Sequence, residues 1–211
     1  MVKKKESGDA PLMVEKYRKV EFTIEGLSPY SPSRPIDAEK RDRQTPDSFD
    51  EEHWRERAHV NDEGHVCLAP QSLYLALLQA CMLRGDKIPG RGNKTWTDVF
   101  MTGVTMETFM PVLNPLIKRD NLACDKRYVP SDGTPAFKAR GTSKRVWRRF
   151  PIIPSGWRAT LVAEIGNEAI TEEVFLKHLV DAGRKIGLGR FRPSSRGFYG
   201  RFVVTDYKFT E

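Results

Sequence analysis

The chain runs Ile186-Gly187-Leu188-Gly189-Arg190-Phe191-Arg192-Pro193-Ser194-Ser195-Arg196-Gly197-Phe198-Tyr199-Gly200-Arg201-Phe202 where a helical pattern gives way to an alternating one. Four glycines in fourteen residues, Gly187, Gly189, Gly197 and Gly200, allow positive φ and a close approach of the backbone to a ligand. Exposed amides in such a loop can bind phosphate oxygens. We call residues 187–201 the glycine-rich loop and expect it to contact an anionic ligand.

The side chains of the glycine-rich loop suit a nucleic-acid strand. Guanidinium groups match phosphates, and aromatic faces stack on bases. The loop supplies both kinds: Arg190, Arg192, Arg196 and Arg201 beside Phe191, Phe198 and Tyr199. Loops that bind mononucleotides precede a helix, whereas this one follows a helix and lacks a Gly-Lys-Ser/Thr element. We predict that it binds single-stranded nucleic acid. The alternative is a long turn whose aromatic residues pack on the core.

Apolar spacing predicts the elements around the loop. Before it, residues 175–186 carry apolar side chains at helical spacing, in a helix that begins at Asn167 or Thr171. After it, residues 202–209 alternate like a strand.

The rest of the chain supplies three more strands and one more helix. Alternation predicts half-buried strands at 19–25 and 158–165, and helical spacing predicts a helix at 70–83 that Gly85 closes. Residues 101–113, rich in Thr, Val, Met and Phe, are interpreted as another strand. The predicted fold is therefore α+β: a ferredoxin-like, RRM-like βαββαβ unit, with an antiparallel sheet and two helices on one face.

The gaps between these elements predict the domain organisation. Residues 1–16 are expected to be a disordered lead-in, and 17–211 a single domain with insertions at about 27–68 and 114–155. The first insertion is expected to be partly helical around Phe49–Arg57. The second is expected to form a hairpin whose tip is Pro130-Ser131-Asp132-Gly133.

Positive charge is concentrated in two segments. The net charge is +7, but residues 116–149 alone carry ten Lys and Arg against three Asp and Glu, and residues 184–201 carry six against none. Segregation of this kind suits a phosphate polymer, although a solvated surface without a partner is the alternative. The additional nucleic-acid-binding candidates are Lys138, Arg140, Lys144, Arg145, Arg148 and Arg149.

Other classes of function find less support in the sequence. Three widely spaced cysteines indicate reduced thiols, and no segment is apolar enough to span a bilayer, so we expect a soluble cytoplasmic protein. We expect no cofactor, no metal and no membrane partner. The weak catalytic candidates are His59 and His65, which could serve a metal-independent endoribonuclease as acid and base.

The helix, glycine-rich loop and final strand together resemble the RAMP superfamily, the repeat-associated RNA-binding proteins of CRISPR systems. The resemblance rests on Gly187-x-Gly189, seven residues, then Gly197-x-x-Gly200 and Phe202; the family's spacing is about five residues with Gly-x-Gly at both ends. It implies a subunit that binds RNA, or single-stranded DNA, as guide-RNA-binding backbone subunits do. A RAMP-type nuclease and a virus-encoded mimic that joins a CRISPR complex are the alternatives that it leaves open.

The two insertions carry opposite charge. Residues 37–63 hold ten Asp and Glu against five Lys and Arg, whereas residues 116–149 are net basic. Head-to-tail docking of these segments would give self-association into a filament. The resemblance implies other CRISPR-like subunits as further partners. The alternative is a monomer in which the insertions fold back on each other and neutralise their charges internally.

Overall fold

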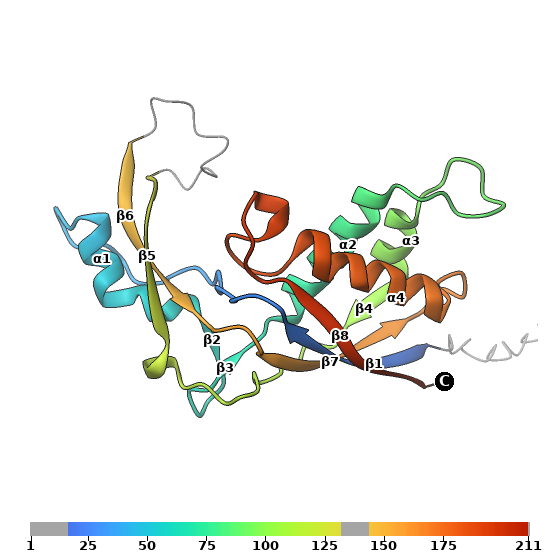
Figure 1. Cartoon of the computed structure of the whole chain (residues 1–211), viewed down its shortest axis with the longest axis horizontal. Helices are drawn as coiled ribbons and strands as arrows, with labels where there is room; N and C mark the ends of the chain where they lie inside the picture. Colours follow the sequence, from blue (N-terminus) through green and yellow to red (C-terminus); the bar gives the residue numbers. More distant parts are fainter. Residues whose placement is uncertain (1–16, 132–143, 211) are drawn as a thin grey trace, which may run out of the picture.

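A four-stranded antiparallel sheet lies at the centre of the computed structural model, which describes residues 17–131 and 144–210 (Figure 1). Its strands follow the order β4 (Val104–Met106), β7 (Arg158–Ile165), β1 (Arg18–Gly26) and β8 (Phe202–Thr210). Every neighbouring pair is antiparallel. The predicted α+β class with an antiparallel sheet is confirmed, and the strand order is in keeping with the predicted βαββαβ unit.

Helices cover one face of this sheet (Figure 1). α2 (Pro70–Arg84) has proline in its first turn and ends at Gly85, whose φ of 60° is left-handed. α4 (Glu172–Asp181) begins after Thr171, whose hydroxyl accepts the Val174 amide at 3.3 Å. Both helices agree with the sequence prediction. The core between layers includes Phe22 of β1 and Phe175 of α4, whose ring centroids lie 5.9 Å apart.

The predicted strand at 101–113 is wrong over most of its length. Residues Trp96–Gly103 form a third helix, α3, on the same face of the sheet, and strand β4 covers Val104–Met106 alone. Trp96, Val99 and Phe100 are buried at helical spacing, and this burial outweighs the strand propensity of the Val and Thr residues nearby.

The two segments that interrupt the sheet pack together beside it. The first contains α1 (Pro46–His53), the short 3₁₀ helix η1 (Trp54–Arg57), and strands β2 (His59–Val60) and β3 (Val66–Cys67). The second contains the turn η2 (Arg119–Asn121) and a hairpin of β5 (Ala123–Pro130) and β6 (Arg145–Ile152), which projects away from the sheet (Figure 1). Helix formation around Phe49–Arg57 and a hairpin after residue 114 are confirmed.

Two sequence predictions fall on residues beyond those described. The lead-in at 1–16 lies outside the described residues, and so do Asp132 and Gly133 of the predicted tip. Among the helices in the described part of the chain, none is long and apolar enough to cross a membrane.

Candidate nucleic-acid interface

The glycine-rich loop starts where α4 widens into a π turn, Ala182–Ile186. Gly187, Gly189 and Gly200 follow with φ of 74°, 68° and 67°. A Cβ at Gly189 would lie 2.2 Å from the Ser31 carbonyl oxygen, and one at Gly200 would lie 1.9 Å from the Leu188 carbonyl oxygen. These glycines therefore let the loop pack tightly on its own chain, instead of giving a ligand access to the backbone as the sequence suggested.

Most amides of the loop are also used within the chain. The Arg190 amide donates to the Ser31 carbonyl at 2.8 Å, and the Gly200 amide donates to the Pro29 carbonyl at 2.7 Å. The amides of Leu188, Gly197 and Tyr199 likewise donate to carbonyls of the loop. The expectation of an amide nest for phosphate is corrected at these positions, and contacts to an anion have to come from side chains.

Two of the three predicted stacking rings hold the hairpin against the loop. Phe191 lies edge-on to Phe150 of β6 and to Tyr199, with centroids 5.1 and 6.0 Å away. Arg127 of β5 stacks over both loop rings, at 4.1 and 4.7 Å, and donates to the Tyr199 hydroxyl at 2.7 Å. Phe198, which is 63% exposed, keeps its face available to a base.

The loop arginines fall into two groups. Arg190 and Arg192 are half-buried, and burial lowers the pKa of both, that of Arg190 to about 10. Arg196 and Arg201 are exposed. Arg190 remains cationic at neutral pH, because its lowered pKa still lies well above 7.

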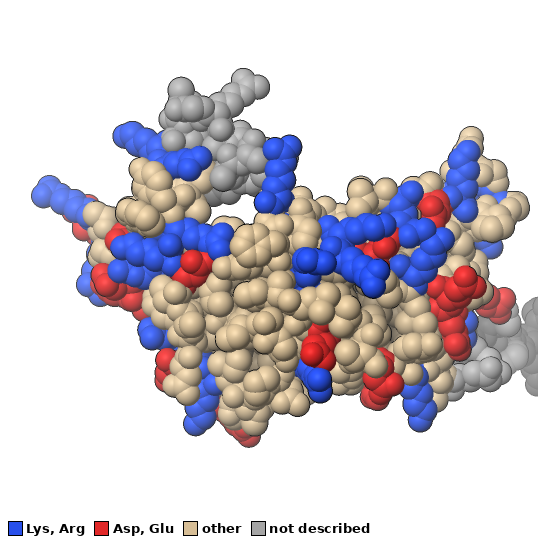
Figure 2. Space-filling view, viewed as in Figure 1, with Lys and Arg blue, Asp and Glu red and all other residues tan. Residues whose placement is uncertain are grey.

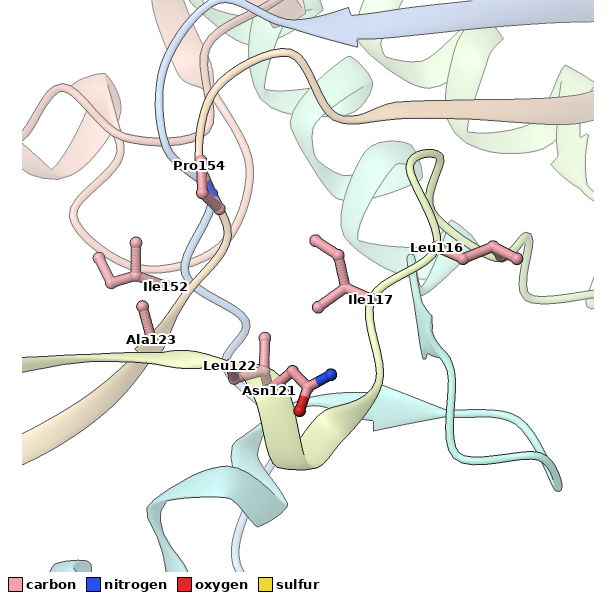
Figure 3. A pocket seen from close by; sticks show the side chains of 7 residues that line it. All are labelled: Leu116, Ile117, Asn121, Leu122, Ala123, Ile152 and Pro154. Carbon is pink, nitrogen blue, oxygen red and sulfur yellow. The ribbon is translucent and has the colours of Figure 1, made fainter.

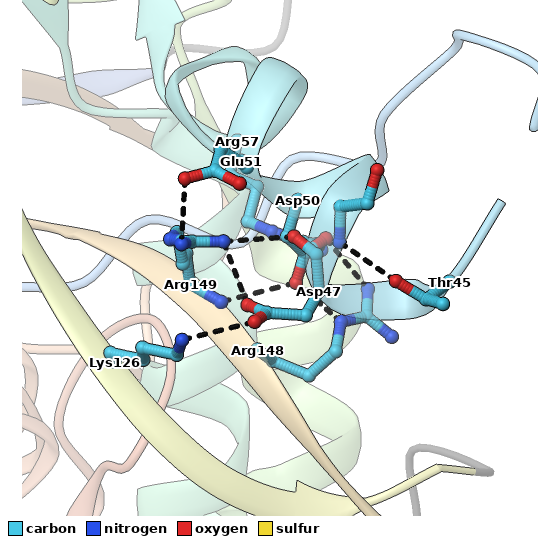
Figure 4. Close-up of polar contacts among 9 residues, drawn as sticks. Thr45, Asp47, Asp50, Glu51, Arg57, Lys126, Arg148 and Arg149 are labelled. Carbon is cyan, nitrogen blue, oxygen red and sulfur yellow. Dashed lines mark hydrogen bonds and ion pairs between the residues drawn. The ribbon is translucent and has the colours of Figure 1, made fainter.

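Two of the hairpin arginines predicted to meet phosphate, Arg148 and Arg149, are paired with the acidic insertion (Figure 4). Arg148 binds Asp50, a fully buried carboxylate that also accepts from Arg57 at 2.8 Å and from the Arg149 amide at 3.1 Å. The Arg149 guanidinium binds Asp47 at 2.7 Å and Glu51 at 2.9 Å.

The charges of Asp50 and its partners are strongly coupled. Burial alone would raise the pKa of Asp50, but the hydrogen bond from Arg148 and the charges of Arg57 and Arg148 hold it below the usual value.

Lys144 and Arg145, at the start of β6, are exposed and remain candidates for phosphate contacts. Lys138 and Arg140 lie outside the described residues.

A pair of exposed rings on the hairpin was missed by the sequence analysis. Tyr128 and Trp147 face each other across β5 and β6, with centroids 5.3 Å apart, and are 51% and 48% exposed. The Lys126 ammonium lies 5.6 Å from the Trp147 ring. The signal in the sequence was a tryptophan in a strand otherwise rich in arginine, which is a pattern that suits base stacking.

The open face of the central sheet is poorly suited to nucleic acid. Two of its cations are paired with glutamates: Lys19 with Glu107 at 3.2 Å and Glu164 at 3.0 Å, and Arg158 with Glu25 at 2.8 Å. This directs attention to the hairpin and loop. Figure 2 shows one group of Lys and Arg side chains at the end with the hairpin and α1 and a second group over the helices α2 and α4, beyond the loop.

The two histidine candidates lie on the β2–β3 hairpin, away from the glycine-rich loop (Figure 1). Burial, with a smaller effect of Arg34, lowers the pKa of His59, so that it is neutral at pH 7. His65 lies 3.2 Å from a Glu63 carboxylate oxygen. No cluster of three or more His, Cys, Asp or Glu side chains suited to a metal occurs within residues 17–131 and 144–210.

A separate apolar pocket of about 290 Å³ lies at the base of the hairpin (Figure 3). Leu116, Ile117, Leu122 and Ile152 contribute to its lining, and Asn121 supplies the polar group. Because the lining carries no charged side chain, this pocket does not contribute to phosphate binding.

Comparison with known proteins identifies the fold. No family model and no curated protein sequence matches the chain. Among solved structures, a chain of the type III-B Cmr-beta bound to cognate target RNA superposes with a TM-score of 0.51 and 11% identity. The fold is shared with that protein. The alignment covers 93% of this chain and 61% of the Cmr-beta chain, so this chain spans less than two thirds of its length. Cmr6 from Pyrococcus furiosus aligns over its whole length and 92% of this chain, at 12% identity and a TM-score of 0.48.

Proposed function

We propose that this chain is a RAMP-type subunit that binds single-stranded nucleic acid, RNA in the first place, along the hairpin and the glycine-rich loop. The observation that carries the proposal is the joint between them. Arg127 of the hairpin stacks on two loop rings and bonds to Tyr199, so two cationic segments far apart in sequence form one surface.

The exposed groups on this surface are of the kinds that a single strand requires. Lys144 and Arg145 of the hairpin and Arg201 of the loop offer positive charge, while Phe198 and Trp147 offer ring faces. Phosphate contacts of this kind supply affinity, and stacking is tolerant of sequence.

The fold supports a place among CRISPR-type subunits. The Cmr-beta structure that shares this fold is bound to target RNA, and the resemblance to RAMP proteins gave the same expectation from residues alone. Association with further subunits along one strand is part of the proposal. The nuclease alternative gains nothing from the structure, since His59 and His65 lie apart from this surface.

The test is binding of a fluorescently labelled 30-nucleotide RNA, and of the matching DNA, measured by anisotropy at several salt concentrations. We expect affinity to fall steeply with salt, with a slope of about 0.7 per phosphate contacted. The double variant Lys144→Gln with Arg145→Gln is expected to bind more weakly and with a smaller slope. Its matched control is Arg91→Gln, an exposed arginine on the loop after α2. Absence of binding at low salt would refute the proposal.

A further inference from the structure

Arg190 is a half-buried cation that forms no ion pair with any described residue. Its guanidinium makes no hydrogen bond or ion pair within the described residues, and its Nε is buried without a partner. The ring of Phe150 lies against it, with the centroid 5.2 Å away. Buried charges in proteins are normally paired, because removing them from water is costly. An arginine left in this state on a cationic surface points to an anionic partner outside the described residues.

Two more arginines share this position. Arg57 lies over the same Phe150 ring at 5.5 Å, and its Nε is also buried without a partner. Arg148 shares Asp50 with Arg57. Burial first, and then repulsion from Arg57 and Arg148, lowers the pKa of Arg190 against a smaller attraction from Asp50. Three guanidinium groups therefore gather around one carboxylate, and that carboxylate is already bound by the other two.

The cluster is open to solvent on one side. The Arg148 side chain is 23% exposed and Arg190 is half-buried, whereas Asp50 and Arg57 form the closed floor. The elements that build it come from both insertions and the loop: η1, β6 and the segment after Gly189. An anion that enters from solvent would meet Arg190 and Arg148 first and would supply the missing negative charge. A phosphate oxygen fits because guanidinium groups bind it through paired N–H donors.

We propose that Arg190, with Arg57 and Arg148 behind it, forms a built site for one backbone phosphate of the bound strand, at the joint between hairpin and loop. This inference rests on the proposed function and adds a specific anchor to it. The unliganded protein carries an uncompensated charge at this site, and the phosphate compensates it. Removal of the Arg190 charge should then weaken RNA binding and at the same time stabilise the protein in the absence of RNA.

The test compares wild type with Arg190→Met, which keeps the length and apolar contact of the side chain, and with the control Arg91→Gln. We expect Arg190→Met to bind the 30-nucleotide RNA roughly tenfold more weakly, as for loss of a charged hydrogen bond, and with a salt slope smaller by about 0.7. Its melting temperature without ligand is expected to equal or exceed that of wild type. A purely structural role for Arg190 predicts a lower melting temperature.

A second arm uses small anions and does not depend on oligonucleotide binding. Inorganic phosphate and the dinucleotide UpU are expected to raise the melting temperature of wild type more than that of Arg190→Met, whereas sodium glutamate at the same ionic strength is not. If glutamate stabilises as well as phosphate, the partner is a carboxylate and the inference is wrong. If wild type and Arg190→Met bind RNA equally, this site is refuted while the proposed function stands. If wild type binds no RNA, the proposed function fails, and the anion arm still decides whether the site exists. Arg190→Gln provides the same comparison should Arg190→Met fail to fold.

Discussion

Gly189 shows how a single residue of the loop is specified by its neighbours. Its φ of 68° lies in the left-handed region, and Ser31 stands where a side chain would go. Gly92 has nearly the same φ, 62°, with nothing within 4 Å of its Cβ position. Alanine substitutions at the two positions therefore distinguish the energetic cost of a left-handed backbone from the cost of steric overlap.

Gly92→Ala is expected to lower the free energy of unfolding by about 1 kcal/mol, the cost of a left-handed conformation for alanine. Gly189→Ala is expected to cost clearly more and to weaken RNA binding, because the loop must move away from Ser31. Urea denaturation of both variants measures the difference. Equal destabilisation by the two substitutions would mean that the loop can shift away from Ser31 without an energetic cost.

Asp50 holds the hairpin against the acidic insertion, because it binds the Arg148 side chain and the Arg149 amide of β6. Replacement by Asn leaves Arg57 and Arg148 buried without their carboxylate, a change that typically costs about 3–5 kcal/mol. The folded-state pKa of Asp50 lies below its unfolded value, so its contribution is present above about pH 4 and is lost as the pH falls through the folded-state pKa. Denaturation at pH 7 and pH 3 should therefore show a smaller difference between wild type and Asp50→Asn at pH 3. The control is Asp42→Asn, whose carboxyl is 96% exposed. A constant difference across this range would contradict the assignment.

At the scale of elements, the hairpin has two distinct faces. Arg127, Arg148 and Phe150 face the loop and the acidic insertion, whereas Tyr128 and Trp147 face solvent. The alternation of a two-stranded ribbon produces this division. The face with Arg127 and Phe150 packs on the loop, whereas the other face pairs with α1 through Lys126 and Arg149 and leaves Tyr128 and Trp147, nearer the tip, exposed for binding.

Trp147 provides a fluorescence signal from the exposed part of the hairpin. The other tryptophans, Trp54, Trp96 and Trp157, are at most 7% exposed, so a change in tryptophan fluorescence on adding RNA would report on Trp147. We expect quenching in wild type and none in Trp147→Phe. Trp147→Ala is expected to lose about 1–3 kcal/mol of binding free energy, the usual value of a stacked base. Quenching that persists in Trp147→Phe would place the strand elsewhere.

The elements that could be predicted from sequence are those with a long, regular pattern. The strands at 18–26 and 158–165 alternate over eight or more residues, and α2 has both a proline start and a glycine end. Strand β4 has three residues and gives no usable period. Helix α3 was not predicted, and its last three residues, Met101–Gly103, were included in the predicted strand at 101–113, which was assigned from its Thr, Val, Met and Phe content.

The candidate site was predicted less completely, because its geometry depends on long-range contacts. The basic loop and hairpin were found from composition. The pairing of Arg148 and Arg149 with α1 joins residues about 100 positions apart, and no local pattern reveals it. No local pattern reveals the position of Arg57 beside Arg190 either, because both pack on Phe150 only when the two insertions and the loop are folded together.

At the scale of the whole molecule, the ion pairs between the insertions bear on assembly. Asp47, Asp50 and Glu51 of α1 are bound by Lys126, Arg148 and Arg149 of the hairpin (Figure 4). These are charges that head-to-tail docking would have required. The internal alternative is therefore what the structure shows at these residues, and a filament would need other surfaces or the strand itself.

Light scattering after gel filtration tests this consequence directly. Without nucleic acid, we expect the mass of one chain at both 50 mM and 500 mM NaCl, because charges already paired within the chain have little to gain from a second copy. With a long RNA, the number of chains per strand is expected to rise with strand length, since each added length offers another set of phosphates. The control is Glu51→Gln, which frees part of the Arg149 guanidinium without removing its bond to Asp47. A mass that grows at low salt in the absence of RNA, in wild type, would show that unpaired charges elsewhere on the chain drive self-association.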